Sequence, residues 1–87
     1  MRHASDMISP AQIRAARAML GWKREELRKR SGVSLSTIAD FETGRNNSLL
    51  TDNANKIIRA FREAGIEFTD ASRQHGAGVR WIEPDTD

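Results

Sequence analysis

The sequence predicts a small all-α domain of four helices followed by a short C-terminal β-strand extension. Three observations support this prediction. A chain of 87 residues forms one domain with a single modest core, because domains of this size bury only about 60 to 65% of the surface that the unfolded chain exposes. Helix start and stop signals follow one another up to Gly65, with apolar residues at helical spacing between them. Beyond Gly65 the apolar residues run or alternate as they do in strands.

The first helix is predicted over residues 10–20, between a strong start signal and a glycine stop. Ser9 can cap its N-terminus, Pro10 suits the first helical position, and Gln12 can reach back to complete a capping box. Gly21 supplies the left-handed stop. The apolar residues between these signals recur at helical spacing and are Ile13, Ala16, Met19 and Leu20.

A short second helix over residues 24–30 and a third helix over residues 35–43 are predicted to meet across a tight turn. Leu27 is the single large apolar residue of the second helix, which therefore needs neighbours to be stable. Ser34 can cap the third helix and Gly44 stops it. The apolar stripe of the third helix consists of Ile38 and Phe41, with part of Leu35.

A fourth helix opens at Thr51 or Asp52, after a loop over residues 45–50, and ends at Gly65. Four helices can thus share one core, to which Trp22, at the corner before the second helix, is expected to contribute by packing. The apolar face of the fourth helix consists of Ala54, Ile57, Phe61 and Ala64, with Ile58 beside them.

Two short strands are predicted after the helices, over residues 66–68 and 79–82. The polar stretch between them contains Gly76 and Gly78 and can form a long turn. Two short strands alone are marginally stable in water. We therefore expect them to pack on the helices, on a second subunit, or on both.

These elements divide the chain into a flexible N-terminus (1–8), a helical domain (9–65) and a strand extension with an acidic tail (66–87). From Ser9 to Ala64 there are eleven Lys or Arg against six acidic residues, a net charge of +5. From Gly65 onward there are two Arg against five acidic residues, a net charge of −3. A basic body with an acidic tail suits a domain that binds a polyanion, although a bias of this size is also common on solvated helix faces.

Several function classes lack the residues that they need. The chain has no cysteine, which excludes disulfides and thiolate metal sites and is compatible with a reducing cytosol. His3 and His75 have no second ligand at a metal-binding spacing, and the serines have no partners arranged for nucleophilic catalysis. The longest apolar run falls far short of the roughly 18 to 20 residues of a membrane span. We expect a cytoplasmic protein that is not an enzyme, with no catalytic residue, cofactor, metal or membrane contact.

The segment from Arg28 to Arg45 has the spacing of a helix-turn-helix. Gly32 can take a positive φ, Val33 can fill the wedge between the helices, and Ser34 can cap the second of them. A helix that enters the major groove of DNA must be narrow and must offer short hydrogen-bonding groups to the base edges. The exposed face of the predicted third helix meets this requirement with Leu35, Ser36, Thr37 and Asp40.

Residues 8–68 resemble the lambda-repressor and Cro-like helix-turn-helix family, also called the xenobiotic-response-element type. The matching pieces are "LGWKREEL", "SGVSLSTIADFETGR" and the fourth helix before "GIEF". The turn, the cap, the apolar spacing and the final Glu42-x-Gly44 all agree with the family pattern. The resemblance implies a lambda-repressor-like domain of four or five helices that binds operator DNA, usually as a dimer.

The resemblance also implies which residues touch DNA. By position, phosphates would be contacted by Arg24, Thr43, Arg45 and Asn46, and bases would be faced by Leu35, Ser36, Thr37 and Asp40. Arg24 stands where the family usually has glutamine, and an arginine can also contact a phosphate. Asp40 suits the groove if it accepts a hydrogen bond from a cytosine amino group. Glu42, where family members make an internal hydrogen bond, is expected to be structural.

The predicted function is that of a transcription regulator with double-stranded DNA as its partner, most simply a dimeric repressor or autoregulator. One half-site gives little specificity in a genome, so two copies on a near-palindromic operator are expected. The alternative is a protein-binding module of the same fold, similar to an antiactivator or antitoxin, and a steep salt dependence of DNA binding would distinguish the two. The residues chosen for the dimer interface are Ile58, Ile66, Phe68, Val79, Trp81 and Ile82.

Overall fold

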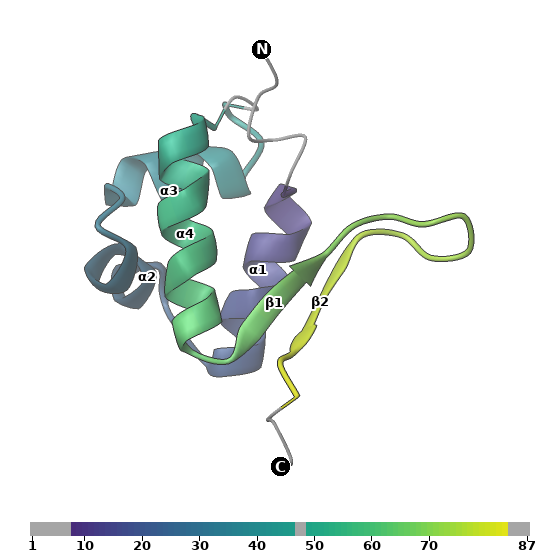
Figure 1. The fold of residues 1–87 in the computed structure, drawn as a ribbon. Coiled ribbons are helices and arrows are strands. Elements are labelled where there is room, and N and C mark those ends of the chain that lie inside the picture. The colour runs from purple at the N-terminus through teal and green to yellow at the C-terminus, as the bar shows by residue number, and fades with distance from the viewer. Residues whose placement is uncertain (1–7, 47–48, 84–87) are drawn as a thin grey trace.

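The structure, a computed structural model, describes residues 8–46 and 49–83. Its elements are α1 (Pro10–Leu20), α2 (Arg24–Ser31), α3 (Leu35–Glu42), α4 (Thr51–Glu63), β1 (Ile66–Thr69) and β2 (Gly78–Trp81) (Figure 1). The four predicted helices and both strands are confirmed to within about two residues at their ends. The described part of the chain is thus mostly helical, with one two-stranded hairpin at its C-terminal end.

Two predicted segments extend beyond the described residues. The N-terminal segment 1–8 is described only at Ile8, whose side chain is buried in the core. Of the predicted acidic tail, residues 84–87 lie outside the description. Among the helices that the structure describes, none is long and apolar enough to cross a membrane.

α1 begins with the predicted capping box. The Ser9 hydroxyl accepts a hydrogen bond from the Gln12 backbone N–H at 3.2 Å, and the Gln12 side-chain oxygen accepts one from the Ser9 N–H at 2.7 Å. Pro10 occupies the first turn, and Gly21 ends the helix with φ of 68°. Each signal acts within four residues of the helix end, which is why the sequence alone predicted these boundaries.

Gln12 also ties α1 to the hairpin. Its side-chain nitrogen donates to the carbonyl oxygens of Thr69, at 3.2 Å, and Gly78, at 2.9 Å. These two residues face each other at the loop end of the antiparallel β1–β2 ladder, and the Gly78 N–H donates to the Thr69 hydroxyl. One nearly buried amide, 5% exposed, therefore fixes both the start of α1 and the position of the hairpin beside it (Figure 1).

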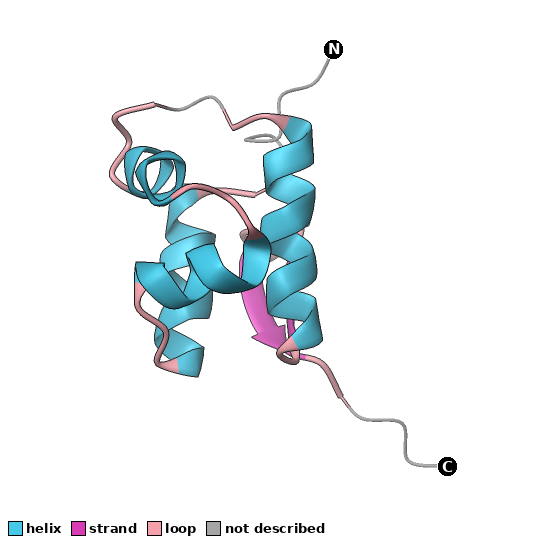
Figure 2. Ribbon diagram, turned by 90° about the vertical axis from the view of Figure 1, so that its left-hand side faces the viewer, coloured by secondary structure: helices cyan, strands magenta, loops and turns pink. Residues whose placement is uncertain are grey.

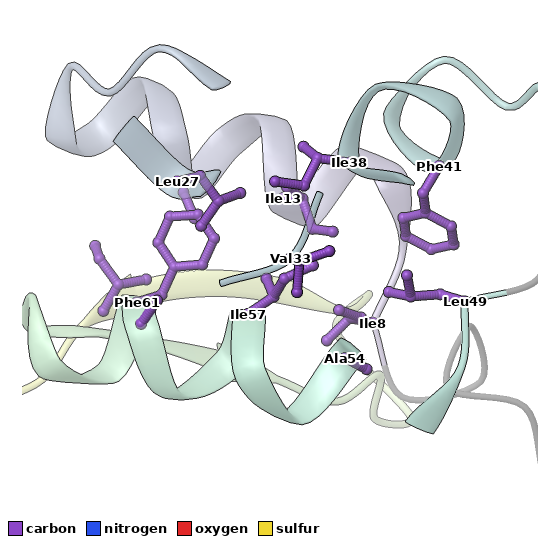
Figure 3. Packing of buried hydrophobic residues seen from close by; sticks show 13 residues of the cluster. Ile8, Ile13, Leu27, Val33, Ile38, Phe41, Leu49, Ala54, Ile57 and Phe61 are labelled. Carbon is purple, nitrogen blue, oxygen red and sulfur yellow. The ribbon is translucent and has the colours of Figure 1, made fainter. Parts of the chain in front are cut away.

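The core lies between α4 and the other three helices (Figure 3). β1 contributes to it through Ile66, which is fully buried. Trp22 stacks on Phe61 with ring centroids 5.3 Å apart, and Phe68 of β1 meets the same ring edge-on at 5.6 Å. These contacts confirm Trp22 as a packing residue. The buried apolar side chains are Ile8, Ile13, Ala16, Leu27, Val33, Ile38, Phe41, Leu49, Ala54, Ile57, Ala60, Phe61 and Ile66.

We predict that Gln12→Leu lowers the free energy of unfolding by about 1–3 kcal/mol, because it leaves partly buried backbone groups at Ser9, Thr69 and Gly78 without their side-chain partner. Urea denaturation followed by circular dichroism measures the change. The control is Gln74→Leu, which removes the same amide from the exposed hairpin loop and should change stability by no more than about 0.5 kcal/mol. Equal effects of the two substitutions would contradict the proposed role of Gln12.

Candidate nucleic-acid interface

The turn between α2 and α3 has the geometry that the sequence predicted. Gly32 has a φ of 78°, and beyond its own chain neighbours no atom lies within 4 Å of the position that a Cβ would take there. Glycine is therefore favoured by the backbone conformation and not by lack of space. Val33 follows it with 2% exposure in the core, and its N–H donates to the Ser31 hydroxyl at 3.1 Å.

Three hydroxyl groups gather at the first turn of α3. Ser34 accepts a hydrogen bond from the Thr37 backbone N–H at 3.3 Å and donates to the Thr37 hydroxyl at 2.8 Å. The Ser36 hydroxyl lies 3.5 Å from that of Ser34. The predicted N-cap is thereby confirmed, and the start of α3 presents short polar groups to solvent.

α3 separates a core face from a solvent face. Ile38, Phe41 and Glu42 are buried, whereas Ser36 is exposed and Leu35 is 42% exposed. The structure places all four predicted base-contacting residues, Leu35, Ser36, Thr37 and Asp40, on the exposed or half-buried part of the helix. Figure 2 looks onto the side of the molecule that holds α2 and α3.

The C-terminal end of α3 leads into a turn that holds the next predicted contacts. The Thr43 hydroxyl donates to the Ala39 carbonyl at 2.8 Å, so its proton is already engaged. The Asn46 backbone N–H donates to the Asp40 carbonyl at 3.1 Å. The Asp40 carboxylate lies 3.9 Å from the guanidinium of Arg45, whose side chain is 81% exposed. Asp40 is therefore partly neutralised by an arginine of the same surface.

Arg24, the predicted phosphate contact at the start of α2, is joined to the buried end of α3. Its Nε donates to Glu42 Oε1 at 3.1 Å, while Arg17 of α1 donates to both oxygens of that carboxylate, at 2.8 and 2.6 Å. The Glu42 side chain is 0% exposed, which confirms it as structural. Sequence reasoning missed Arg17, because residues 17, 24 and 42 lie on three helices and share no local spacing.

Two further arginines of α2 are paired within their own helix. Arg28 bonds to Glu25, and Arg30 bonds to Glu26 at 2.7 Å. The hydrogen bond from Arg28 lowers the pKa of Glu25, and the one from Arg30 lowers the pKa of Glu26. Each of these two pairs carries no net charge. The cations of the helix-turn-helix segment outside these pairs include Arg24, Arg45 and the exposed Lys23 and Lys29.

The residues predicted for a dimer interface divide into three groups. Ile66 is fully buried in the core of its own chain, because it starts β1 directly under the helices, and no surface of it is left for a second subunit. Ile58, Phe68 and Val79 are half-buried against that core. Trp81 is 53% exposed and Ile82 is 37% exposed. Among the described strands β2 pairs only with β1, which leaves its other edge open.

The described residues hold no group of three His, Cys, Asp or Glu side chains that could bind a metal ion. A comparison with protein families finds a match to the family described as helix-turn-helix, of the Cro/C1 type, over residues 13–67. A search of curated proteins finds no match to the chain.

Proposed function

The chain belongs to the Cro/C1-type helix-turn-helix family, and from this premise we propose that it is a homodimeric DNA-binding transcription regulator, most simply a repressor or autoregulator. The match covers the turn, α3 and all of α4. DNA binding is the function that this family implies. The finer proposal concerns which residues read bases, which hold phosphates, and how two copies associate.

The observation that supports base reading by α3 is the division of its surface. One face is held in the core by Ile38 and Phe41, while the opposite face has short side chains around Ser36. An α-helix with side chains is about 10–12 Å wide and the major groove about 12 Å, so a helix with short outer side chains can approach the base edges closely. Serine and threonine hydroxyls can bond base edges, and Leu35 suits a thymine methyl.

The proposed phosphate contacts lie on both sides of α3 in the chain. Arg24 precedes it at the start of α2, and Thr43, Arg45 and Asn46 follow it. Arg45 has an exposed guanidinium within 3.9 Å of Asp40, so a phosphate would compete with a weak, solvated ion pair. The Thr43 hydroxyl would donate to a phosphate only after giving up its bond to the Ala39 carbonyl.

A homodimer would bring two copies of α3 to successive half-sites of a near-palindromic operator. The exposed Trp81 and Ile82, beside the open edge of β2, support the hairpin as the interface. Ile58, Phe68 and Val79 offer half-buried apolar surface next to them. Ile66 is not part of the proposed interface, since it belongs to the core.

We predict that Ser36→Arg changes the preferred operator by about 1–3 kcal/mol at the contacted base pair without unfolding the domain. Selection from a random duplex library, followed by sequencing, measures the preference, and thermal melting checks the fold. Ala71→Arg adds the same charge in the exposed loop of the hairpin, which projects from the molecule on the side away from α3 (Figure 1), and should leave the selected sequence unchanged. An unaltered preference in Ser36→Arg would favour a protein partner for this face.

We predict that Arg45→Ala weakens binding to selected and random duplexes by similar factors and flattens the salt dependence by roughly one unit, because every duplex carries the phosphate that it would neutralise. Fluorescence anisotropy at three salt concentrations measures both quantities. Arg73→Ala, an exposed arginine on the hairpin loop, is the matched control and should keep the original slope. A loss confined to the selected duplex would instead make Arg45 a base-reading residue.

We predict that Trp81→Ser converts the dimer to a monomer and weakens operator binding, because it removes the largest exposed apolar side chain of the hairpin. Analytical ultracentrifugation measures the oligomeric state. A point variant is preferable to truncation after Gly65, which would also remove Ile66 from the core. Leu50→Ser, at a residue that is 67% exposed before α4, should remain dimeric. If Trp81→Ser also remained dimeric, the hairpin would not be the interface.

A further inference from the structure

The carboxylate of Glu42 is shared by two guanidinium groups. Arg17 bonds both of its oxygens, and Arg24 bonds Oε1 through Nε at 3.1 Å. One negative and two positive charges leave the cluster with a net charge of +1. Because Glu42 is the last residue of α3 while Arg17 and Arg24 belong to α1 and α2, the carboxylate joins all three helices at one point.

The two arginines differ in how many of their donors are occupied. Arg17 uses Nε and Nη2 on Glu42 and Nη1 on the Trp22 carbonyl at 3.0 Å, and its side chain is 18% exposed. Arg24 is 37% exposed and uses only Nε within the described part of the chain. The surplus positive charge and the available terminal nitrogens therefore belong to Arg24, at the first residue of α2.

We propose that Glu42 is a positioning residue for DNA binding, which holds Arg24 by its Nε so that Nη1 and Nη2 face a phosphate. This inference rests on the proposed function. A guanidinium held at one edge has fewer conformations to lose on binding, and its two remaining nitrogens can bond a phosphate as a fork. The same carboxylate ends α3, so the phosphate contact and the reading helix are set at a fixed distance from each other.

The direction in which Glu42→Gln changes the affinity for DNA distinguishes a positioning role from a purely electrostatic one. Glu42→Gln removes a negative charge from the DNA-binding side and raises the net charge by one, so long-range electrostatics alone predicts tighter binding to DNA. If Glu42 positions Arg24, the same substitution weakens binding, because the neutral amide holds the guanidinium less firmly.

The experiment is a double-mutant cycle of Glu42→Gln and Arg24→Ala, with affinity for a short random-sequence duplex measured at three salt concentrations. We expect each single substitution to weaken binding about 2- to 10-fold, and Arg24→Ala to flatten the salt dependence by roughly one unit. The double substitution should bind no more weakly than Arg24→Ala, since Glu42 acts through Arg24. Urea denaturation tests whether Glu42→Gln is folded under the binding conditions.

A second variant keeps the test valid if Glu42→Gln does not fold. Arg24→Lys changes only a partly exposed side chain and preserves the net charge, but one ammonium group cannot bond Glu42 and also offer a planar fork to a phosphate. We expect it to bind about 2- to 10-fold more weakly than the wild type with an unchanged salt slope. Wild-type affinity in Arg24→Lys would overturn the proposal.

A measurement on the free protein tests the bond between the Arg24 Nε–H and Glu42 directly. In ¹H–¹⁵N spectra of the free protein, the Arg24 Nε–H should exchange slowly with solvent and should exchange faster in Glu42→Gln, with Arg73 as the exposed reference. Rapid exchange of Arg24 in the wild type would overturn the positioning role.

The binding outcomes separate this inference from the proposed function. Unchanged or tighter binding by Glu42→Gln, or losses that multiply in the double variant, would overturn the inference while DNA binding stands. A wild-type chain that binds no duplex would overturn the proposed function and the inference with it.

Discussion

The buried carboxylate of Glu42 is the constraint on which the arrangement of the first three helices depends. Burying an ion costs several kcal/mol unless it is paired and its remaining lone pairs are bonded. Here both oxygens accept from Arg17, and one also accepts from Arg24. Without Arg17 the carboxylate would keep only the single bond from Arg24, and α1 and α3 cannot move apart without losing the two bonds from Arg17. Arg14 of α1 adds a hydrogen bond to the Glu42 carbonyl.

The side chain of Gln12 attaches the hairpin to α1, as Glu42 attaches α3 to α1 and α2. Two short strands are marginal on their own, yet this hairpin is held at three places. Ile66 lies in the core, Phe68 contacts the Phe61 ring edge-on, and the Gln12 amide bonds the loop end of the ladder. The ladder is consequently attached to the folded domain at both of its ends, while Trp81 on β2 stays exposed. The hairpin can therefore expose the apolar side chain of Trp81 while Ile66 stays packed in the core.

α3 is held through its inner face and both ends, so its outer face stays exposed to solvent. Its inner residues and its last residue are fixed by packing and by the arginines, and its first turn is closed by the Ser34 hydroxyl. Rigid support beneath short polar side chains is what a reading helix requires, because a contact with a base edge depends on position to within a fraction of an ångström. The same support places Arg24 and Arg45 on either side of the helix in the chain, where phosphates would lie in the proposed complex.

The sequence by itself determined the helices, the turn and the family, because these depend on interactions within about four residues. The capping box at Ser9, the hydroxyl cap at Ser34 and the positive φ at Gly32 are all local. The tertiary structure decided what each polar side chain meets: Gln12 bonds the hairpin 57 and 66 residues away, and Arg24 bonds Glu42 across 18 residues. It also moved Ile66 from a candidate interface into the core. Such partners depend on how the helices close around the core, and periodicity along the chain does not contain that information.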